Sequence, residues 1–403
     1  MKQYKLKNGL TVIYHKKPTS SVAIEIAVKT GSNNETSKIS GISHFIEHVV
    51  FEGTKNYNSS KELANEIEKY GGELNAYTSD ERTCYYVKII KKHFDTALRI
   101  LDQIVFNPSF KNEDIEKERK VILDEIKMVT DEPRFHQWIL FEKTLFEKHP
   151  VRNPTYGTNQ AIKSIKREDI LKYYNSHYIP NNIIISAVGE IPNFEKIINK
   201  IFSKYTPKPI QKKKKVKEPI QTKPKKAKEK KEVSNSYAVF GYKTTNRLEN
   251  DSYALDVIKA ILGRGQSGKI FYEIRTKRGL AYDIGVYHEP ASDYGFFAVH
   301  CGTDKKNINK IVKIVQEEFR KLQKTTQEEL EEAKDYIEGA HSLRMEDTYA
   351  LADNTSYWQQ IGNARMAEEY IKKIRKITTT DLKRAAKKYF TKNYTLTAIE
   401  QKK

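Results

Sequence analysis

The chain has 403 residues, long enough for two domains, since a single hydrophobic core rarely grows beyond about 250 residues. Apolar residues make up 38% and charged residues 31%, which is typical of a soluble globular protein, and no stretch reaches the ~20 apolar residues of a membrane helix. The net charge of +20 is compatible with a basic nucleic-acid-binding protein. The two cysteines are too few for a disulfide framework.

The first residues run directly into an apolar strand and lack the features of a secretory or transit signal, so we expect a cytoplasmic protein. Alternating and apolar runs then predict both strands and helices in the first half of the chain. The predicted strands are 10–15, 21–29 and 82–90, and the predicted helices lie near 42–52, 59–70 and 93–106. These elements favour an α+β sandwich, with helices packed on a mostly antiparallel sheet.

The helix near 42–52 contains the main chemical signal. Apolar residues cover most of its circumference, which predicts a buried helix. His44, Glu47 and His48 form one polar strip at positions i, i+3 and i+4. Two imidazoles one turn apart can bind Zn²⁺, and the acid beside them could take a proton from a metal-bound water. A structural hydrogen-bond cluster is the alternative, and a third ligand would decide between the two.

The best source of a third ligand is the predicted helix over 112–130. Glu118 and Glu125 lie on the same stripe as its core-facing apolar residues. Because a buried carboxylate needs a cation, Glu125 could complete a His-His-Glu site. Glu118, two turns earlier on the same face, is better placed to orient a histidine.

Residues 207–232 hold 12 Lys, 3 Glu and four prolines but no aromatic residue. This composition predicts a solvated, extended linker, with a basic arm for an anionic partner as the alternative. The absence of aromatic residues gives bases nothing to stack on, which argues against nucleic acid as a partner.

The two halves that flank this linker resemble each other. Residues 165–188 align with 377–399 at an offset of 212, each reading as a capped helix, a turn and a strand. Upstream, the helix that opens at 113–116 has its counterpart at 328–331. In this second alignment the positions of the two glutamates are Ala333 and Ala340, so the acids are specific to the first half. The predicted organisation is therefore a catalytic domain 1–206, a linker 207–232 and a homologous domain 233–403 without a metal site.

With these residues in view, the chain resembles the pitrilysin family of inverted zinc peptidases, which includes insulin-degrading enzymes and mitochondrial processing peptidases. The family pattern H-x-x-E-H is followed, after 76 residues, by the third-ligand Glu, and the same spacing separates His48 from Glu125. A second family Glu, seven positions before the ligand, matches Glu118. The resemblance extends from about residue 5 to the end, and the Lys-rich linker is its one departure.

Two further segments carry the resemblance. Residues 71–78 are similar to a G-G-x-x-N-A-x-T segment, which implies that an edge strand with Asn75 and Ala76 binds the peptide backbone. Residues 275–282 are similar to an R-x₆-Y element, which implies that Arg275 and Tyr282 hold the substrate and assist catalysis. From the residues alone, Arg275 and Tyr282 would be a surface charge and a half-buried aromatic.

The resemblance implies a metalloendopeptidase that holds one Zn²⁺ per chain and cleaves extended peptides or unfolded polypeptides. Family members of this length supply half of a chamber, and since this chain carries both the zinc motif and the R-x₆-Y element, a homodimer is expected. The alternatives are a non-catalytic partner subunit of the same fold and, from another class, a basic nucleic-acid-binding protein.

Overall fold

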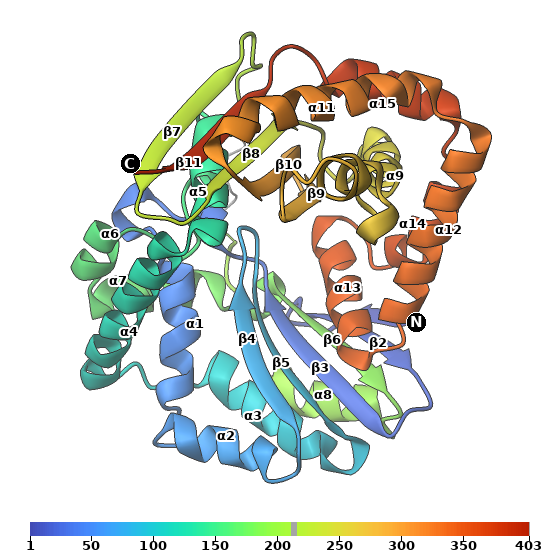
Figure 1. Ribbon diagram of the computed structural model, residues 1–403. Helices are drawn as coiled ribbons and strands as arrows, with labels where there is room; N and C mark the ends of the chain where they lie inside the picture. The colour runs from blue at the N-terminus through green and yellow to red at the C-terminus, as the bar shows by residue number, and fades with distance from the viewer. Residues whose placement is uncertain (211–215, 403) are drawn as a thin grey trace. The chain divides into compact units, whose positions relative to one another are not determined.

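The protein divides into two compact units, each with its own sheet, in a computed structural model that describes residues 1–210 and 216–402 (Figure 1). Unit 1 comprises Met1–Met128, Asn153–Val216 and Arg344–Ala367. Unit 2 comprises Val129–Arg152, Lys217–Leu343 and Glu368–Lys403. Each unit thus includes one segment from the opposite half of the chain.

Sheet 1, in unit 1, has the strand order β1-β2-β6-β3-β5-β4, and only its β2/β6 pair is parallel. Its strands are β1 (Lys2–Lys5), β2 (Thr11–Lys16), β3 (Ser21–Val28), β4 (Glu73–Thr78), β5 (Thr83–Ile90) and β6 (Ile183–Gly189). The helices of unit 1 include α1 (Ile42–Glu52), α2 (Ser60–Glu68), α3 (Phe94–Phe106), α4 (Asn112–Asp131), α6 (Asn159–Ser164), α7 (Arg167–His177), α8 (Phe194–Phe202) and α13 (Thr348–Ile361).

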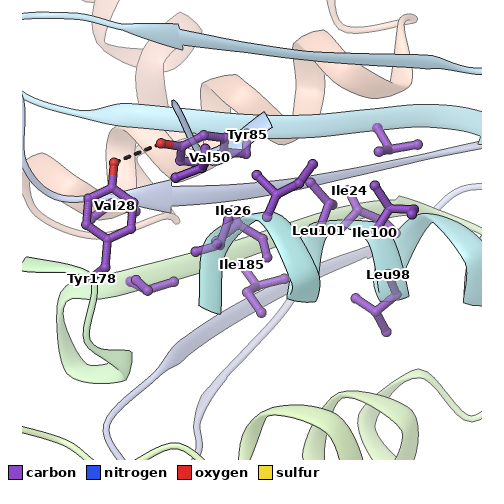
Figure 2. Close-up of a cluster of buried hydrophobic side chains, with 14 of the residues drawn as sticks. Ile24, Ile26, Val28, Val50, Tyr85, Leu98, Ile100, Leu101, Tyr178 and Ile185 are labelled. Carbon is purple, nitrogen blue, oxygen red and sulfur yellow. Dashed lines mark hydrogen bonds between the residues drawn. The ribbon is translucent and has the colours of Figure 1, made fainter. Parts of the chain in front are cut away.

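Sheet 1 is buried on both faces, because alternate residues of β3 point to opposite sides. Ile24 and Ile26 pack in the core that contains α1 and α3 (Figure 2). On the other face, Ala27 belongs to a smaller apolar cluster and Glu25 accepts a hydrogen bond from Ser356 of α13. The near-continuous apolar run of β3 therefore reflects burial from two sides.

Sheet 2, in unit 2, has the order β7-β11-β8-β10-β9, and only its β7/β11 pair is parallel. Its strands are β7 (Lys225–Lys231), β8 (Ser236–Lys243), β9 (Asp283–Pro290), β10 (Gly295–Thr303) and β11 (Thr395–Gln401). The helices of unit 2 include α5 (Pro133–Leu145), α9 (Asp251–Gly263), α10 (Lys269–Phe271), α11 (Ile308–Lys321), α12 (Gln327–Arg344), α14 (Met366–Arg375) and α15 (Thr379–Tyr389).

The two sheets repeat one topology, which confirms the predicted fold of two homologous units with mostly antiparallel sheets. The order β2-β6-β3-β5-β4 in sheet 1 matches β7-β11-β8-β10-β9 in sheet 2, including the position of the parallel pair. The aligned segments 165–188 and 377–399 form α7 with β6 and α15 with β11, and Asp169 and Asp381 occupy equivalent capping positions in the two helices.

Part of the predicted linker is a strand of sheet 2. Residues 225–231 form β7, which pairs with β11 in the place that β2 holds beside β6. The Lys-rich composition did not indicate this strand, because the strand is held by backbone pairing with β11 and by ion pairs and not by apolar side chains. Lys228 pairs with Glu400, and Lys225 pairs with Glu147. Residues 211–215 of the predicted linker lie outside the described part of the chain.

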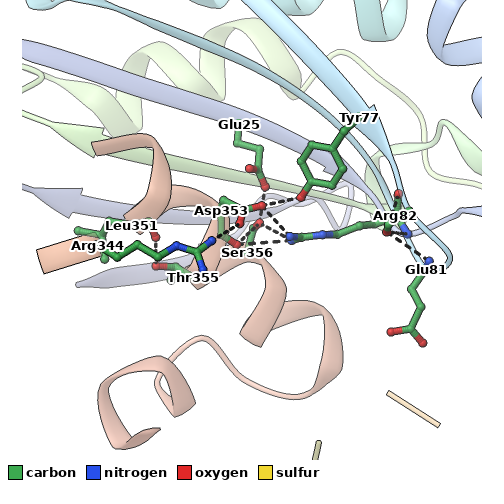
Figure 3. A network of polar contacts seen from close by, with 10 residues as sticks. Glu25, Tyr77, Glu81, Arg82, Arg344, Leu351, Asp353, Thr355 and Ser356 are labelled. Atoms are coloured by element: carbon green, nitrogen blue, oxygen red, sulfur yellow. Dashed lines mark hydrogen bonds and ion pairs between the residues drawn. The ribbon is translucent and has the colours of Figure 1, made fainter. Parts of the chain in front are cut away.

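One helix from each half packs on the sheet of the opposite half. The helix α5 lies against β8 and β11, and Gly241 of β8 permits this contact, because a Cβ atom there would lie 2.8 Å from the Phe141 ring (Figure 1). The helix α13 lies against β3 and β6 and is fixed by Asp353, which accepts from Arg82 at 2.6 Å (Figure 3). The predicted domains 1–206 and 233–403 did not include this exchange.

Candidate metal centre

The helix α1 carries the three candidate site residues on the face that is not packed in the core. It begins after Gly41, whose φ of 91° suits a residue without Cβ, and ends at Gly53. The buried residues are the apolar ones expected from the sequence, together with Ser43: Ile42, Ser43, Phe45, Ile46, Val49 and Val50. His44, Glu47 and His48 are only partly buried, so their polar ends remain accessible to a ligand.

His44, His48 and Glu125 of α4 come together within unit 1. The Nε2 atoms of the two histidines lie 3.3 Å apart, and Oε2 of Glu125 lies 3.6 Å from each of them. Ligands about 2.0–2.1 Å from a tetrahedral ion are separated by about 3.3 Å. The three atoms therefore match three corners of a zinc site and leave the fourth corner for another ligand.

Glu118 contacts one of the histidines. Its Oε2 lies 3.0 Å from Nδ1 of His48, on the side of the ring opposite the Nε2 atom that faces Glu125. A carboxylate in this position fixes the ring and makes its other nitrogen a better metal ligand. The Glu118 side chain is also well buried.

The protonation of the cluster follows from burial and from these carboxylates. Burial and the neighbouring charge of His48 lower the pKa of His44 to about 4, which keeps His44 neutral, as a metal ligand must be. Burial would also lower the pKa of His48, but the carboxylates of Glu118 and Glu125 outweigh it and raise that pKa to about 9. A cation bound at Nε2 of His48 would compete with this proton.

Glu47 is held by a residue from another element. Burial raises the pKa of its carboxyl, and a hydrogen bond from Thr78 of β4, 2.5 Å long, opposes that shift. Thr78 lies in the G-G-x-x-N-A-x-T segment, but no role for it followed from the sequence. The contact joins α1 to the edge strand β4 and points one carboxylate oxygen of Glu47 in a fixed direction.

The strand β4 is at the edge of sheet 1, as the resemblance implied. Among the described strands it pairs only with β5, with Asn75 opposite Tyr86 and Ala76 opposite Tyr85. The side chain of Asn75 accepts a hydrogen bond from the backbone N–H of Ala76 at 2.8 Å. The outer edge of such a strand can accept an extended peptide as a further strand.

Arg275 and Tyr282 belong to unit 2. Arg275 is exposed, and its guanidinium lies 4.9 Å from the centre of the Phe271 ring. The hydroxyl of Tyr282 lies 3.1 Å from that of Tyr237, and 43% of the Tyr282 side chain is exposed. Both side chains are thus free to contact a ligand.

Two family models match consecutive parts of the chain. Residues 10–159 match the insulinase domain of peptidase family M16, and residues 164–337 match the domain described as the peptidase M16 inactive domain. The matched second domain has no H-x-x-E-H sequence, and within residues 1–210 and 216–402 the candidate metal-binding cluster lies in unit 1. None of the helices in the described residues is long and apolar enough to cross a membrane.

Relatives of similar length extend this match to the whole chain. The uncharacterized zinc protease YmxG of Bacillus subtilis is 31% identical, covering 99% of this chain and 98% of its own. An uncharacterized zinc protease of Rickettsia bellii is 30% identical, covering 98% and 96%. A crystal structure of a protease from Helicobacter pylori superposes with a TM-score of 0.93 at 25% identity, covering 99% of both chains. The protein belongs to peptidase family M16, the insulinase family, which confirms the resemblance to inverted zinc peptidases.

Proposed function

We propose that the protein is a zinc metalloendopeptidase that hydrolyses extended peptides or unfolded polypeptides. The observation that supports this most directly is the spacing of the His44, His48 and Glu125 ligand atoms, 3.3–3.6 Å, with Glu47 on the same face of α1. A structural hydrogen-bond cluster would not require this tetrahedral spacing, nor an acid beside it.

In this proposal the two Nε2 atoms and the Glu125 carboxylate hold one Zn²⁺, and Glu118 orients His48. When bound, the ion would act as a Lewis acid and lower the pKa of a water toward about 7. Neutral His44 and the anionic Glu125 carboxylate, whose pKa is lowered by its hydrogen bond with His48, are in the states that this requires.

Glu47 acts as the general base. Its carboxylate accepts the proton of the attacking water and later delivers that proton to the leaving amine. Thr78 keeps the carboxylate turned in one direction through both steps. Burial raises the pKa of Glu47, which makes it a stronger base than an exposed glutamate.

The substrate backbone pairs with the free edge of β4, beside Asn75 and Ala76, and the resemblance assigns Arg275 and Tyr282 to the same substrate. Recognition of main chain more than side chains predicts cleavage of many sequences. A homodimer, which rests on the resemblance, and a cytoplasmic location are further parts of the proposal.

The test is incubation of unstructured peptides with the protein, with and without a chelator, followed by mass spectrometry. We expect cleavage that stops on chelation and returns with Zn²⁺. Glu47→Gln should retain zinc and lose about a thousandfold in kcat, because only the proton acceptor is removed. Glu52→Gln is the matched control on the same helix; its carboxylate pairs with Lys117.

Full activity of Glu47→Gln would exclude Glu47 as the base. A wild-type protein that binds zinc but cleaves no peptide would favour the alternative of a non-catalytic partner subunit.

A further inference from the structure

The N-terminus of α1 is capped by a side chain from outside the helix. Helices usually begin at a Ser, Thr, Asp or Asn whose oxygen accepts a hydrogen bond from a first-turn N–H group. The cap residue of α1 is Gly41, which has no side chain to do this. Instead, Glu35 accepts from the N–H of Gly41 at 2.6 Å and from the N–H of Ser43 at 2.9 Å.

The carboxyl group of Glu35 reaches this position at an energetic cost. Burial raises its pKa to about 8, although the two N–H groups and the Ser43 hydroxyl act in the opposite direction. A short polar cap at the start of the helix would satisfy the same N–H groups without placing an acid inside the protein. Glu35 thus takes the place that a short polar cap residue has in most helices.

Other contacts fix the same turn of the helix. The Ser43 hydroxyl lies 2.9 Å from that of Tyr173, which lies 2.9 Å from the Thr30 hydroxyl. A Cβ atom on Gly41 would lie 2.6 Å from the carbonyl oxygen of Tyr156, so the backbone is closely confined on that side. The first turn of α1 is thus held along its axis and laterally, immediately before His44.

This arrangement bears on the metal cluster because its ligands come from two helices. His44 and His48 move with α1, whereas Glu125 belongs to α4, and each histidine lies 3.6 Å from it. A functional site of this kind has to be held to within about 0.5 Å. A shift of α1 by that distance would spoil the fit to a tetrahedral ion.

We propose that Glu35 is a positioning residue of the metal site, which sets the axial position of α1 against α4 by bonding to the N–H groups of Gly41 and Ser43. The inference rests on the proposed zinc site and adds to it a residue that contacts neither metal nor ligand. Its loss should weaken zinc binding by 10- to 100-fold, the usual range for residues that orient metal ligands.

The experiment measures the zinc dissociation constant by competition with a chromophoric chelator, together with urea unfolding of the metal-free protein. We expect Glu35→Ala to weaken zinc binding by 10- to 100-fold and Glu35→Gln, which retains one acceptor, by less. The visible spectrum of the Co²⁺-substituted protein should change in the same order, because it reports ligand geometry.

Asp102→Asn is the matched control. Asp102 is a buried carboxylate of the same unit that accepts from the Tyr205 hydroxyl at 2.6 Å, and burial also raises its pKa. We expect this variant to change unfolding but to leave zinc affinity within about threefold and the Co²⁺ spectrum unchanged.

If Glu35→Gln and Glu35→Ala are folded, bind zinc as tightly as the wild type and have an unchanged Co²⁺ spectrum, this inference is overturned, whereas the proposed function is not. An equal loss of affinity in Asp102→Asn would overturn it too, since the effect would then follow from stability. If Glu35→Ala does not fold, the near-isosteric Glu35→Gln decides. Absence of zinc binding by the wild-type protein would overturn the proposed function and this inference with it.

Discussion

At the scale of single residues, the contact between Thr78 and Glu47 shows how the two ends of the candidate site are joined. Glu47 projects from a helix and Thr78 from the edge strand β4, 31 positions later in the chain. Its hydroxyl donates to one carboxylate oxygen of Glu47. The other oxygen is then left in a defined direction for a proton.

Replacing Thr78 by Val should lower kcat by about ten- to a hundredfold, the loss expected for a hydrogen bond to a charged group of 1.5–3 kcal/mol. The zinc content should stay constant, because Thr78 contacts none of the three candidate ligands. Thr78→Ser restores the hydroxyl and should recover most of the rate. Steady-state kinetics and metal analysis of both variants check this, and an unchanged kcat in Thr78→Val would remove the contact from the mechanism.

The sequence predicted the residues whose spacing lies within one element. His44, Glu47 and His48 share one helix, and Glu118 and Glu125 share the core-facing stripe of another, so helical periodicity alone brings each set to one face. It did not predict the contact of Thr78 with Glu47 or that of Glu35 with Gly41. These contacts depend on how a strand or a loop folds back against α1, and the local sequence pattern does not determine that tertiary packing.

At the scale of elements, α13 is attached to sheet 1 by buried polar groups as well as by apolar packing. Asp353 accepts from Arg82 at 2.6 Å and from the Tyr77 hydroxyl at 2.5 Å, and Ser356 donates to Glu25 (Figure 3). Burial raises the pKa of Glu25 to about 7, with a further rise from Asp353 that Arg82 partly offsets. The sequence of α13 shows no sign of this role, because its partners lie more than 250 residues away.

The raised pKa of Glu25 predicts a pH-dependent stability. Between its ordinary pKa of 4.5 and about 7, folded Glu25 holds a proton that the unfolded chain releases, so its contribution to the unfolding free energy falls as the pH rises. A shift of this size corresponds to about 3 kcal/mol at most. Relative to Glu25→Gln, the wild-type protein should therefore lose stability between pH 4.5 and 7.5.

Urea unfolding of the two proteins across this range measures the difference. Ser356→Ala is the control, since it removes one hydrogen bond of Glu25 but keeps the acid, and it should retain the wild-type slope with pH. Parallel profiles for wild type and Glu25→Gln would show that the pKa of Glu25 is not raised in the folded state.

At the scale of the whole molecule, the exchange of α5 and α13 means that the segment 207–232 is not the only covalent connection between the units. The chain passes from one unit to the other after residues 128, 152, 216, 343 and 367. The duplicated topology was visible in the sequence through the aligned segments 165–188 and 377–399. The exchange was not, because a helix that covers its own sheet and one that covers another have the same amphipathic pattern.

This organisation predicts that the first half cannot fold by itself. A fragment of residues 1–206 retains sheet 1 and all five residues of the candidate metal centre but lacks α13, so the face of β3 and β6 that α13 covers would be exposed. Arg82, only 8% exposed in the intact protein, would also lose its ion pair with Asp353. Domains of this size are stable by only about 5–15 kcal/mol. We therefore expect fragment 1–206 to be aggregated or unfolded when expressed alone. It should be recovered as a folded complex when it is co-expressed with 217–403, which supplies α13 to unit 1 and contains most of unit 2. Circular dichroism, size-exclusion chromatography and zinc binding distinguish these states. A folded fragment 1–206 that binds zinc as tightly as the whole chain would show that α13 is dispensable for unit 1.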